Sequence, residues 1–189
     1  MRIIGGEHKG RHILPPKTFN ARPTTDFAKE GLFNTLANLY DFETITVLDL
    51  FSGTGGITYE FASRGCKNIT AIEMNHIHSN FIKTTIAKLK LEGVNCVRHN
   101  VFDFLPVCRL KFDLIFADPP YEIEGLAGIP DKILSQGLLN TNGILIFEHP
   151  ASFNFKEHPY FFKEKKYGNV HFSFFNPQES TQLNNQITN

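Results

Sequence analysis

Short apolar runs alternate with amphipathic stretches along most of this chain. Continuous apolar runs of four to eight residues are typical of parallel strands that are buried on both faces. Amphipathic stretches with an apolar residue every three or four positions are typical of helices that pack on such a sheet. The alternation predicts an α/β fold with a mostly parallel sheet. The predicted core strands are 46–51, 68–74, 94–98, 112–117 and 143–148.

Four helices are predicted between or before these strands. The first covers residues 26–40, where Thr24, Thr25 and Asp26 offer N-caps and Ala28, Leu32, Leu36 and Leu39 recur at helical spacing. A second follows at 57–64. A third begins after Asn75, places Ile77, Phe81, Thr85, Ile86 and Leu89 on one face, and ends at Gly93. A fourth, short helix covers 131–136.

Both ends of the chain carry a pattern of their own. Residues 2–6 and 11–14 predict a small N-terminal β-hairpin around a glycine-containing loop, and residues 161–167 and 170–175 predict a second hairpin that closes the fold. The polar residues 178–189 predict a disordered tail. The expected organisation is therefore a hairpin and helix at 1–40, a core at 41–177 and the tail.

The first candidate for chemistry is Asp118-Pro119-Pro120-Tyr121, which directly follows the apolar run 112–117. Two prolines end the strand and remove two N–H donors, so the acid is left at the carboxyl end of the strand, where open α/β sheets bind ligands. Asp118 and the Pro119 carbonyl supply acceptors, and Tyr121 supplies a flat aromatic face. This combination suits a planar group that carries an amine, such as a nucleobase.

A glycine loop is the second candidate, and it joins the strand 46–51 to the helix 57–64. Gly53 and Gly55 allow a ligand to approach the backbone closely. A dinucleotide-binding loop would have a third glycine or an alanine where Thr58 stands. Glu73 ends the next strand about 20 residues later, where an acid can accept hydrogen bonds from a ribose diol.

These motifs resemble those of S-adenosylmethionine-dependent methyltransferases. Asp118-Pro-Pro-Tyr resembles the (Asp/Asn/Ser)-Pro-Pro-(Tyr/Phe/Trp) motif of enzymes that methylate amines, and Asp-x-Phe-x-Gly-x-Gly from Asp49 resembles their cofactor loop. The string from Arg22 to Leu36 and the first residues, Arg2-Ile-Ile-Gly-Gly, resemble the RsmD-type family, which methylates guanine N2 in 16S rRNA. The resemblance covers residues 1–176, and the segment after Glu148 departs most from it.

The resemblance implies a class I methyltransferase fold, Rossmann-like, with seven strands and a C-terminal antiparallel hairpin. It also implies S-adenosylmethionine as cofactor and direct methyl transfer to the N2 amine. At the adenine, Asn100 and the Val101 amide match the family pattern, and Asp103 is the competing candidate. The implied catalytic residues are Asp118, Pro119 and Tyr121, and the implied cofactor residues are Asp49, Phe51, Gly53, Gly55, Glu73, Met74, Asn100, Val101 and Asp118.

Composition narrows the function classes. The 41% apolar and 20% charged fractions of the 189 residues are those of a globular domain. No apolar run approaches the roughly 20 residues that cross a bilayer, and no signal peptide is visible, so a cytoplasmic protein is expected. Cys66, Cys96 and Cys108 are odd in number and widely spaced, which argues against disulfides and zinc. We expect no metal in the reaction.

Net charge is zero, which argues against a simple RNA-binding module. Positive charge is concentrated in the first 30 residues, and the candidate RNA contacts are Arg2, Lys9, Arg11, Arg22 and Thr24. A neutral protein should bind naked RNA weakly. The expected partner is therefore 16S rRNA in a partly assembled small ribosomal subunit, bound by a monomer.

Three alternatives remain from the sequence. A DNA adenine or cytosine N-methyltransferase would share the Asp118 motif, but 189 residues leave no room for a large target-recognition domain. A nicotinamide-dependent oxidoreductase would share a glycine loop, but Thr58 and the final hairpin disfavour it. A noncatalytic ribosome-assembly factor could retain the fold, although it would not need the chemical positions.

Overall fold

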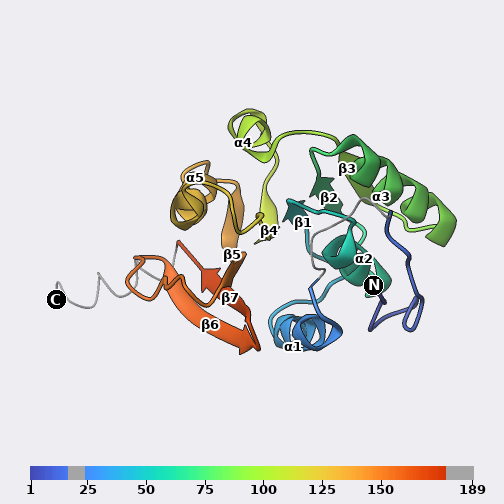
Figure 1. Ribbon diagram of the computed structural model, residues 1–189, viewed down its shortest axis with the longest axis horizontal. Helices are drawn as coiled ribbons and strands as arrows, with labels where there is room; N and C mark the ends of the chain where they lie inside the picture. Colours follow the sequence, from blue (N-terminus) through green and yellow to red (C-terminus); the bar gives the residue numbers. More distant parts are fainter. Residues whose placement is uncertain (17–23, 178–189) are drawn as a thin grey trace.

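A seven-stranded sheet in the order β3-β2-β1-β4-β5-β7-β6 forms the centre of the computed structural model, which describes residues 1–16 and 24–177 (Figure 1). Five strands are parallel, and β7 is antiparallel to both of its neighbours. This order, with its closing antiparallel hairpin, is the predicted methyltransferase topology. The strands are β1 (Val47–Leu50), β2 (Ile69–Ile72), β3 (Val94–Val97), β4 (Phe112–Ala117), β5 (Leu139–Pro150), β6 (Phe161–Tyr167) and β7 (Val170–Phe175).

Helices cover both faces of the sheet (Figure 1). The side chains of α1 and α2 pack on one face with Leu114, Phe116 and Phe174, and α3 extends this layer over β2 and β3. The other face packs against α4 and α5. The helices are α1 (Asp26–Ala37), α2 (Gly56–Ser63), α3 (His76–Leu89), α4 (Val101–Phe104) and α5 (Ile129–Leu134), with short 3-10 turns at Leu105–Val107 and Leu126–Gly128.

The register of the three central strands aligns the carboxyl ends of β1 and β4 with Phe147 of β5, a strand that continues to Pro150. Leu50 at the end of β1 lies opposite Ala117 at the end of β4, and Ala117 lies opposite Phe147 in β5. The segments after β1 and β4 therefore leave the sheet side by side, next to Glu148, which lies within β5. This edge of the sheet is where the ligand site of an open α/β fold is expected.

All four predicted helices differ from the structure at their ends. The helices predicted at 57–64 and 131–136 lie at Gly56–Ser63 and Ile129–Leu134. The first helix ends at Ala37, so Leu39 lies beyond it and is exposed instead of packing on the sheet. The third ends at Leu89, where Lys90 takes the left-handed conformation that was expected of Gly93. Its buried face holds Ile82 while Ile77 is exposed, because tertiary packing sets the rotation of this weakly amphipathic helix.

The N-terminal hairpin is present but scarcely forms strands. A single bridge joins Arg2 and His12, and further backbone bonds join Ile3 to Arg11 and Ile13 to Met1. The apolar side chains Ile3 and Ile13 pack beside α2 and α3, so the arm is held by the core domain. The predicted tail at 178–189 and Arg22 lie outside the described residues.

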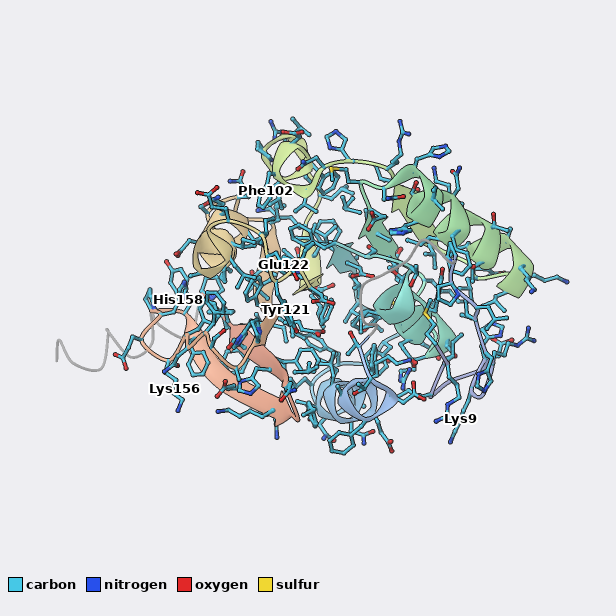
Figure 2. All side chains as sticks on the ribbon, in the orientation of Figure 1. Lys9, Phe102, Tyr121, Glu122, Lys156 and His158 are labelled. Carbon is cyan, nitrogen blue, oxygen red and sulfur yellow. The ribbon has the colours of Figure 1, made fainter. Side chains whose placement is uncertain are left out.

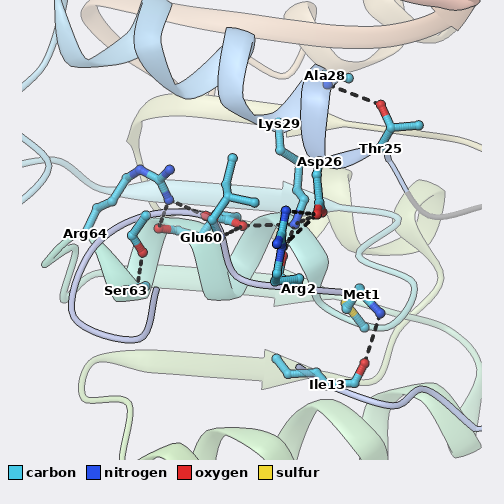
Figure 3. A network of polar contacts seen from close by, with 12 residues as sticks. Met1, Arg2, Ile13, Thr25, Asp26, Ala28, Lys29, Glu60, Ser63 and Arg64 are labelled. Carbon is cyan, nitrogen blue, oxygen red and sulfur yellow. Dashed lines mark hydrogen bonds and ion pairs between the residues drawn. The ribbon is translucent and has the colours of Figure 1, made fainter. Parts of the chain in front are cut away.

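A buried ionic network fastens this arm to α1 and α2 (Figure 3). Lys29 of α1 and Glu60 of α2 are 3% and 0% exposed, and their charged atoms are 2.9 Å apart. The same Glu60 accepts from the Ile4 N–H at 2.9 Å and from the Arg64 guanidinium. Lys29 also donates to the Arg2 carbonyl. Because α2 begins at the glycine loop, this network ties the N-terminal arm to the candidate ligand site.

Replacing Glu60 with alanine should strongly destabilise the protein, because it removes the buried carboxylate that pairs with both Lys29 and Arg64 and leaves Lys29 with only the partly exposed Asp26, 3.5 Å away. We expect a loss of about 3–5 kcal/mol in the free energy of unfolding, measured by urea denaturation. The control is Glu92→Ala, which removes a carboxylate from an exposed pair with Lys67. Exposed pairs contribute about 0–1 kcal/mol, so equal losses in the two variants would contradict this role for Glu60.

Candidate active site

A cavity of about 1100 Å³ opens at the carboxyl ends of β1, β2, β4 and β5. It is at the upper end of the size range of small-molecule sites, so it has room for more than a single small ligand. Its walls come from the glycine loop, from the turn after β4 and from the segment before α1, and the β6–β7 turn at Gly168 contributes as well. Tyr121 and Glu122, at the centre of the view in Figure 2, belong to this wall.

The Asp118 motif lies as predicted, directly after β4. Asp118 is partly buried and lines the cavity together with Pro119 and Tyr121. Burial raises the pKa of Asp118 well above the usual range of an aspartate, and the nearby carboxylates of Glu148 and Asp49 raise it further. Tyr121 donates its hydroxyl to Glu148 Oε1 at 3.3 Å, which fixes the orientation of the aromatic ring.

The glycine loop contains three residues with positive φ angles. Gly53 and Gly55 have φ angles of 56° and 83°, and a Cβ at Gly55 would lie 2.6 Å from the Tyr59 ring. The backbone of Phe51 is also in the left-handed region, with a φ of 58°, which is rarely adopted by residues that have a side chain. Such strain costs about 1–3 kcal/mol and is concentrated at functional sites.

Asp49 lies under this loop and is almost fully buried. Its carboxylate accepts a short hydrogen bond from the Thr58 hydroxyl. Desolvation raises the pKa of Asp49 to about 7, although the bonds from Thr58 and Ser52 oppose the rise. Thr58, which distinguishes this loop from a dinucleotide-binding loop, therefore has a role of its own in holding the acid.

Glu73 directly follows the strand β2 and is joined to the glycine loop by a hydrogen bond. Its Oε2 atom accepts from the Gly53 N–H at 2.8 Å, and its Oε1 atom accepts from the Asn75 N–H at 2.7 Å. His78, which the sequence analysis did not single out, lies 3.8 Å from Oε1 and also lines the cavity. Burial raises the pKa of Glu73 despite these hydrogen bonds.

The predicted adenine residues are brought together at one end of the cavity. Met74 is 65% exposed, and its sulfur lies 3.6 Å from the Asn100 amide nitrogen. Asn100 also caps α4 by accepting from the Phe102 N–H at 2.8 Å. Asn100, Val101 and Phe102 line the cavity, whereas the exposed Asp103 is not among the lining residues.

Glu148 is a cavity residue that the sequence analysis did not place in the site. It follows Phe147 in β5, is 3% exposed and accepts from the Thr24 hydroxyl at 3.1 Å as well as from Tyr121. Burial raises its pKa to about 7. The signal in the sequence was the same as for Asp118, namely an acid at the end of an apolar run.

The predicted RNA contacts are not gathered in one place. Thr24 lines the cavity and binds Glu148. Arg2 is paired with Asp26 of α1 at 2.9 Å. Lys9 lies on the loop of the arm, well away from Tyr121 in the view of Figure 2, and neither it nor Arg11 lines the cavity.

Comparisons with known proteins decide the family. A family model described as Conserved hypothetical protein 95 matches residues 1–176. The chain belongs to this family.

Within residues 1–16 and 24–177, no helix is long and apolar enough to cross a membrane, and no group of three or more His, Cys, Asp or Glu side chains could hold a metal ion.

Relatives of known name agree with this membership. Ribosomal RNA small subunit methyltransferase D of Buchnera aphidicola subsp. Baizongia pistaciae is 30% identical over 179 residues, which are 93% of this chain and 91% of that protein. The protein of the same name from Escherichia coli strain K12 is 34% identical over 148 residues, 78% of this chain and 71% of the relative. The resemblance to the RsmD-type family is thereby confirmed.

A solved structure supports the same fold. The Escherichia coli protein yhhF superposes with a TM-score of 0.79 at 29% identity, over 93% of this chain and 96% of that chain. The similarity therefore extends from the N-terminal arm through the final hairpin. It includes the elements that carry the Asp118 motif and the glycine loop.

The buried carboxyl of Asp49 should make the empty protein less stable as pH rises. Its folded pKa of about 7 exceeds the unfolded value of about 3.9, so the folded state binds an extra proton between these values. The free energy of unfolding should fall through this window by up to about 1.4 kcal/mol per pH unit for one proton.

Urea denaturation between about pH 5 and pH 8 measures this dependence. Asp49→Asn should have a shallower slope than the wild type, and Glu148 should account for part of what remains. Glu92→Gln, which alters an exposed carboxylate, is the control and should keep the wild-type slope. If Asp49→Asn had the same slope of unfolding free energy against pH as the wild type, Asp49 would not be the source of the pH dependence.

Proposed function

We propose that this protein transfers the methyl group of S-adenosylmethionine to the exocyclic N2 amine of a guanine in 16S rRNA. The relatives bear the name of small-subunit rRNA methyltransferases, which supports the reaction class and the rRNA. The observation that carries the finer proposal is the placement of Asp118, Pro119 and Tyr121 in one cavity with the glycine loop. This arrangement provides two acceptors and an aromatic plate for the base beside a site for the cofactor.

The residues on the cofactor side fit S-adenosylmethionine. Gly53 lines the cavity and has no side chain to keep a ligand from the loop backbone, and the two acids Asp49 and Glu73 line the cavity as well. Asp49 would attract the ammonium of the methionine part, directly or through water, and Glu73 would accept from the ribose diol. Met74, Asn100 and Val101 would contact the adenine. When bound, the cofactor supplies an electrophilic methyl group on a positively charged sulfur.

The residues on the base side would activate a poor nucleophile. The lone pair of the guanine amine is delocalised into the ring, and hydrogen bonds from its two N–H groups to Asp118 and the Pro119 carbonyl would draw the nitrogen toward sp3 geometry. These acceptors also stabilise the positive charge that develops on nitrogen, by up to several kcal/mol in a site that excludes water. Because burial raises the pKa of Asp118, its ionised form is also a good acceptor for the proton that the amine loses.

Tyr121 would hold the base in the plane that this attack requires. A target base must leave its stack in the RNA before it can reach the cavity. Stacking on an aromatic side chain contributes roughly 1–3 kcal/mol per base. The hydroxyl of Tyr121 is held by Glu148, so the ring is oriented before the base arrives.

Nucleoside mass spectrometry after incubation with labelled S-adenosylmethionine tests the reaction. Wild-type protein should form N2-methylguanosine in unmodified small-subunit particles, and Asp118→Ala should reduce the rate by roughly 100-fold or more, the size expected for losing one transition-state acceptor. Asp131→Ala, a change at an exposed carboxylate on α5, should retain activity.

Two further arms of this assay test the substrate. Naked 16S rRNA should be a poorer substrate than partly assembled particles if bound ribosomal proteins complete the binding site. Methylation of DNA adenine or cytosine, with no product in rRNA, would overturn the assignment. Cofactor binding without any methylation would instead favour a noncatalytic assembly factor.

Cofactor affinity separates the two candidate adenine residues. Asn100→Ala should weaken S-adenosylmethionine binding by roughly tenfold, because it removes a hydrogen-bonding group and the cap of α4. Asp103→Ala should leave the affinity within about twofold, because this side chain does not line the cavity. Isothermal titration calorimetry measures both, and a larger loss at Asp103 would reverse the assignment.

A further inference from the structure

We propose that Glu148 selects guanine, by accepting a hydrogen bond from the N1–H of the base whose N2 amine is held by Asp118. The inference rests on the proposed function and deepens it, since it names the residue that distinguishes guanine from the other bases that carry an amine. The mechanism described above uses Glu148 only to hold Tyr121.

The strand register places Glu148 directly beside Asp118. Ala117, the last residue of β4, pairs with Phe147 of β5, so Asp118 follows the end of β4 beside Glu148, which is still within β5. The carboxylate of Glu148 is close enough to raise the pKa of Asp118. Neighbouring strands are about 4.8 Å apart, and paired residues project to the same face of a sheet. The two carboxyl groups therefore reach adjacent positions in the cavity, and each lines it.

Glu148 keeps hydrogen-bonding capacity for a ligand. Its two observed donors are hydroxyl groups, Thr24 on Oε2 at 3.1 Å and Tyr121 on Oε1 at 3.3 Å. A carboxylate has about four acceptor positions, so two such bonds do not saturate it. Both bonds also hold the carboxyl in one place, between the proposed stacking ring and the segment before α1. A buried carboxylate in this setting gains from every additional donor, and the cavity is where such a donor would come from.

The donor pattern of guanine fits two adjacent carboxylates. Its Watson–Crick edge presents the N1–H and the N2 amine side by side, and enzymes that extrude a base read this edge through hydrogen bonds. In adenine and cytosine the ring nitrogen next to the amine is an acceptor. An ionised Glu148 would face that acceptor with no proton between them, and such a mismatch discriminates strongly between substrates. The pair of acids thus favours guanine over the bases of the DNA-methylating alternative.

A purely structural role for Glu148 makes a different prediction. If the residue only held Tyr121 and Thr24, replacing it would slow every substrate alike. A role in reading the base would change the preference between two bases that both carry the N2 amine. Guanine and 2,6-diaminopurine form such a pair, because the second keeps the N2 amine but has an acceptor in place of the N1–H.

The test uses 16S RNA ligated to carry either base at the position that wild-type protein methylates, and assembled into small-subunit particles. The assay is run at about pH 8.5, which is above the pKa of about 7 to which burial raises Glu148, so this carboxyl group is ionised. Wild type should prefer guanine in kcat/KM by roughly 10- to 100-fold, the size expected for losing one hydrogen bond to a charged group. Glu148→Gln can donate an N–H to the diaminopurine ring nitrogen, so its preference should narrow to near unity or reverse.

Two control variants isolate the reading of the base from the positioning of Glu148. Thr24→Ala and Tyr121→Phe each remove one hydroxyl donor from Glu148, and both should lower the rate on the two RNAs by similar factors while the preference for guanine stays. Unchanged S-adenosylmethionine affinity shows that Glu148→Gln is folded. If Glu148→Gln kept the wild-type preference for guanine over 2,6-diaminopurine, the role proposed for Glu148 would be wrong, while the proposed function would stand. Failure of wild type to methylate either RNA would overturn the proposed function and the inference with it.

Discussion

The register of three parallel strands is the constraint on which the rest of the site depends. Pairing of Leu50 with Ala117, and of Ala117 with Phe147, brings the carboxyl ends of β1 and β4 into line with Phe147 of β5. The glycine loop and Asp118 leave the sheet at this line, and Glu148 lies beside them within β5. A shift of one residue would turn the two acids to the opposite face, because side chains alternate along a strand. The apolar strands thus determine the chemistry as much as the polar residues do.

Concentrating carboxyl groups at this edge has a cost in stability. Asp49 and Glu148 have pKa values raised to about 7, and Asp118 is raised as well, because each carboxyl is removed from water near the others. A cationic cofactor and a base rich in N–H donors are the ligands that would relieve this cost. The buried pair of Lys29 and Glu60 belongs to a different part of the structure, where a matched cation already balances the acid.

The elements with local signals could be predicted from the sequence. The apolar run that ends in two prolines located β4 and Asp118, and the turn at Gly168 located the final hairpin with its observed bounds. The glycine loop was recognised from Gly53 and Gly55 between a predicted strand and a predicted helix, and both glycines have the positive φ angles that glycine adopts without strain. Of the proposed cofactor residues, only Gly55 does not line the cavity, and the place that its Cβ would take is filled by the Tyr59 ring.

What depends on non-local packing could not be predicted. Glu148 enters the site through the register between β4 and β5, which the sequence does not specify, and its bond to Thr24 spans 124 positions. The rotation of α3, which buries Ile82 and exposes Ile77, is set by contacts with neighbouring elements. The pairing of Arg2 with Asp26 likewise follows from the docking of the arm on α1.

A structure of the protein bound to its rRNA substrate and a non-reactive analogue of S-adenosylmethionine would test the central claim most directly. The measured quantities are the distances from the target guanine N2 to the Asp118 carboxylate and to the Pro119 carbonyl oxygen. Both should be about 3 Å, the length of an N–H···O hydrogen bond, with the base stacked on Tyr121. A target amine that lies outside the cavity, or that turns away from Asp118, would contradict the account.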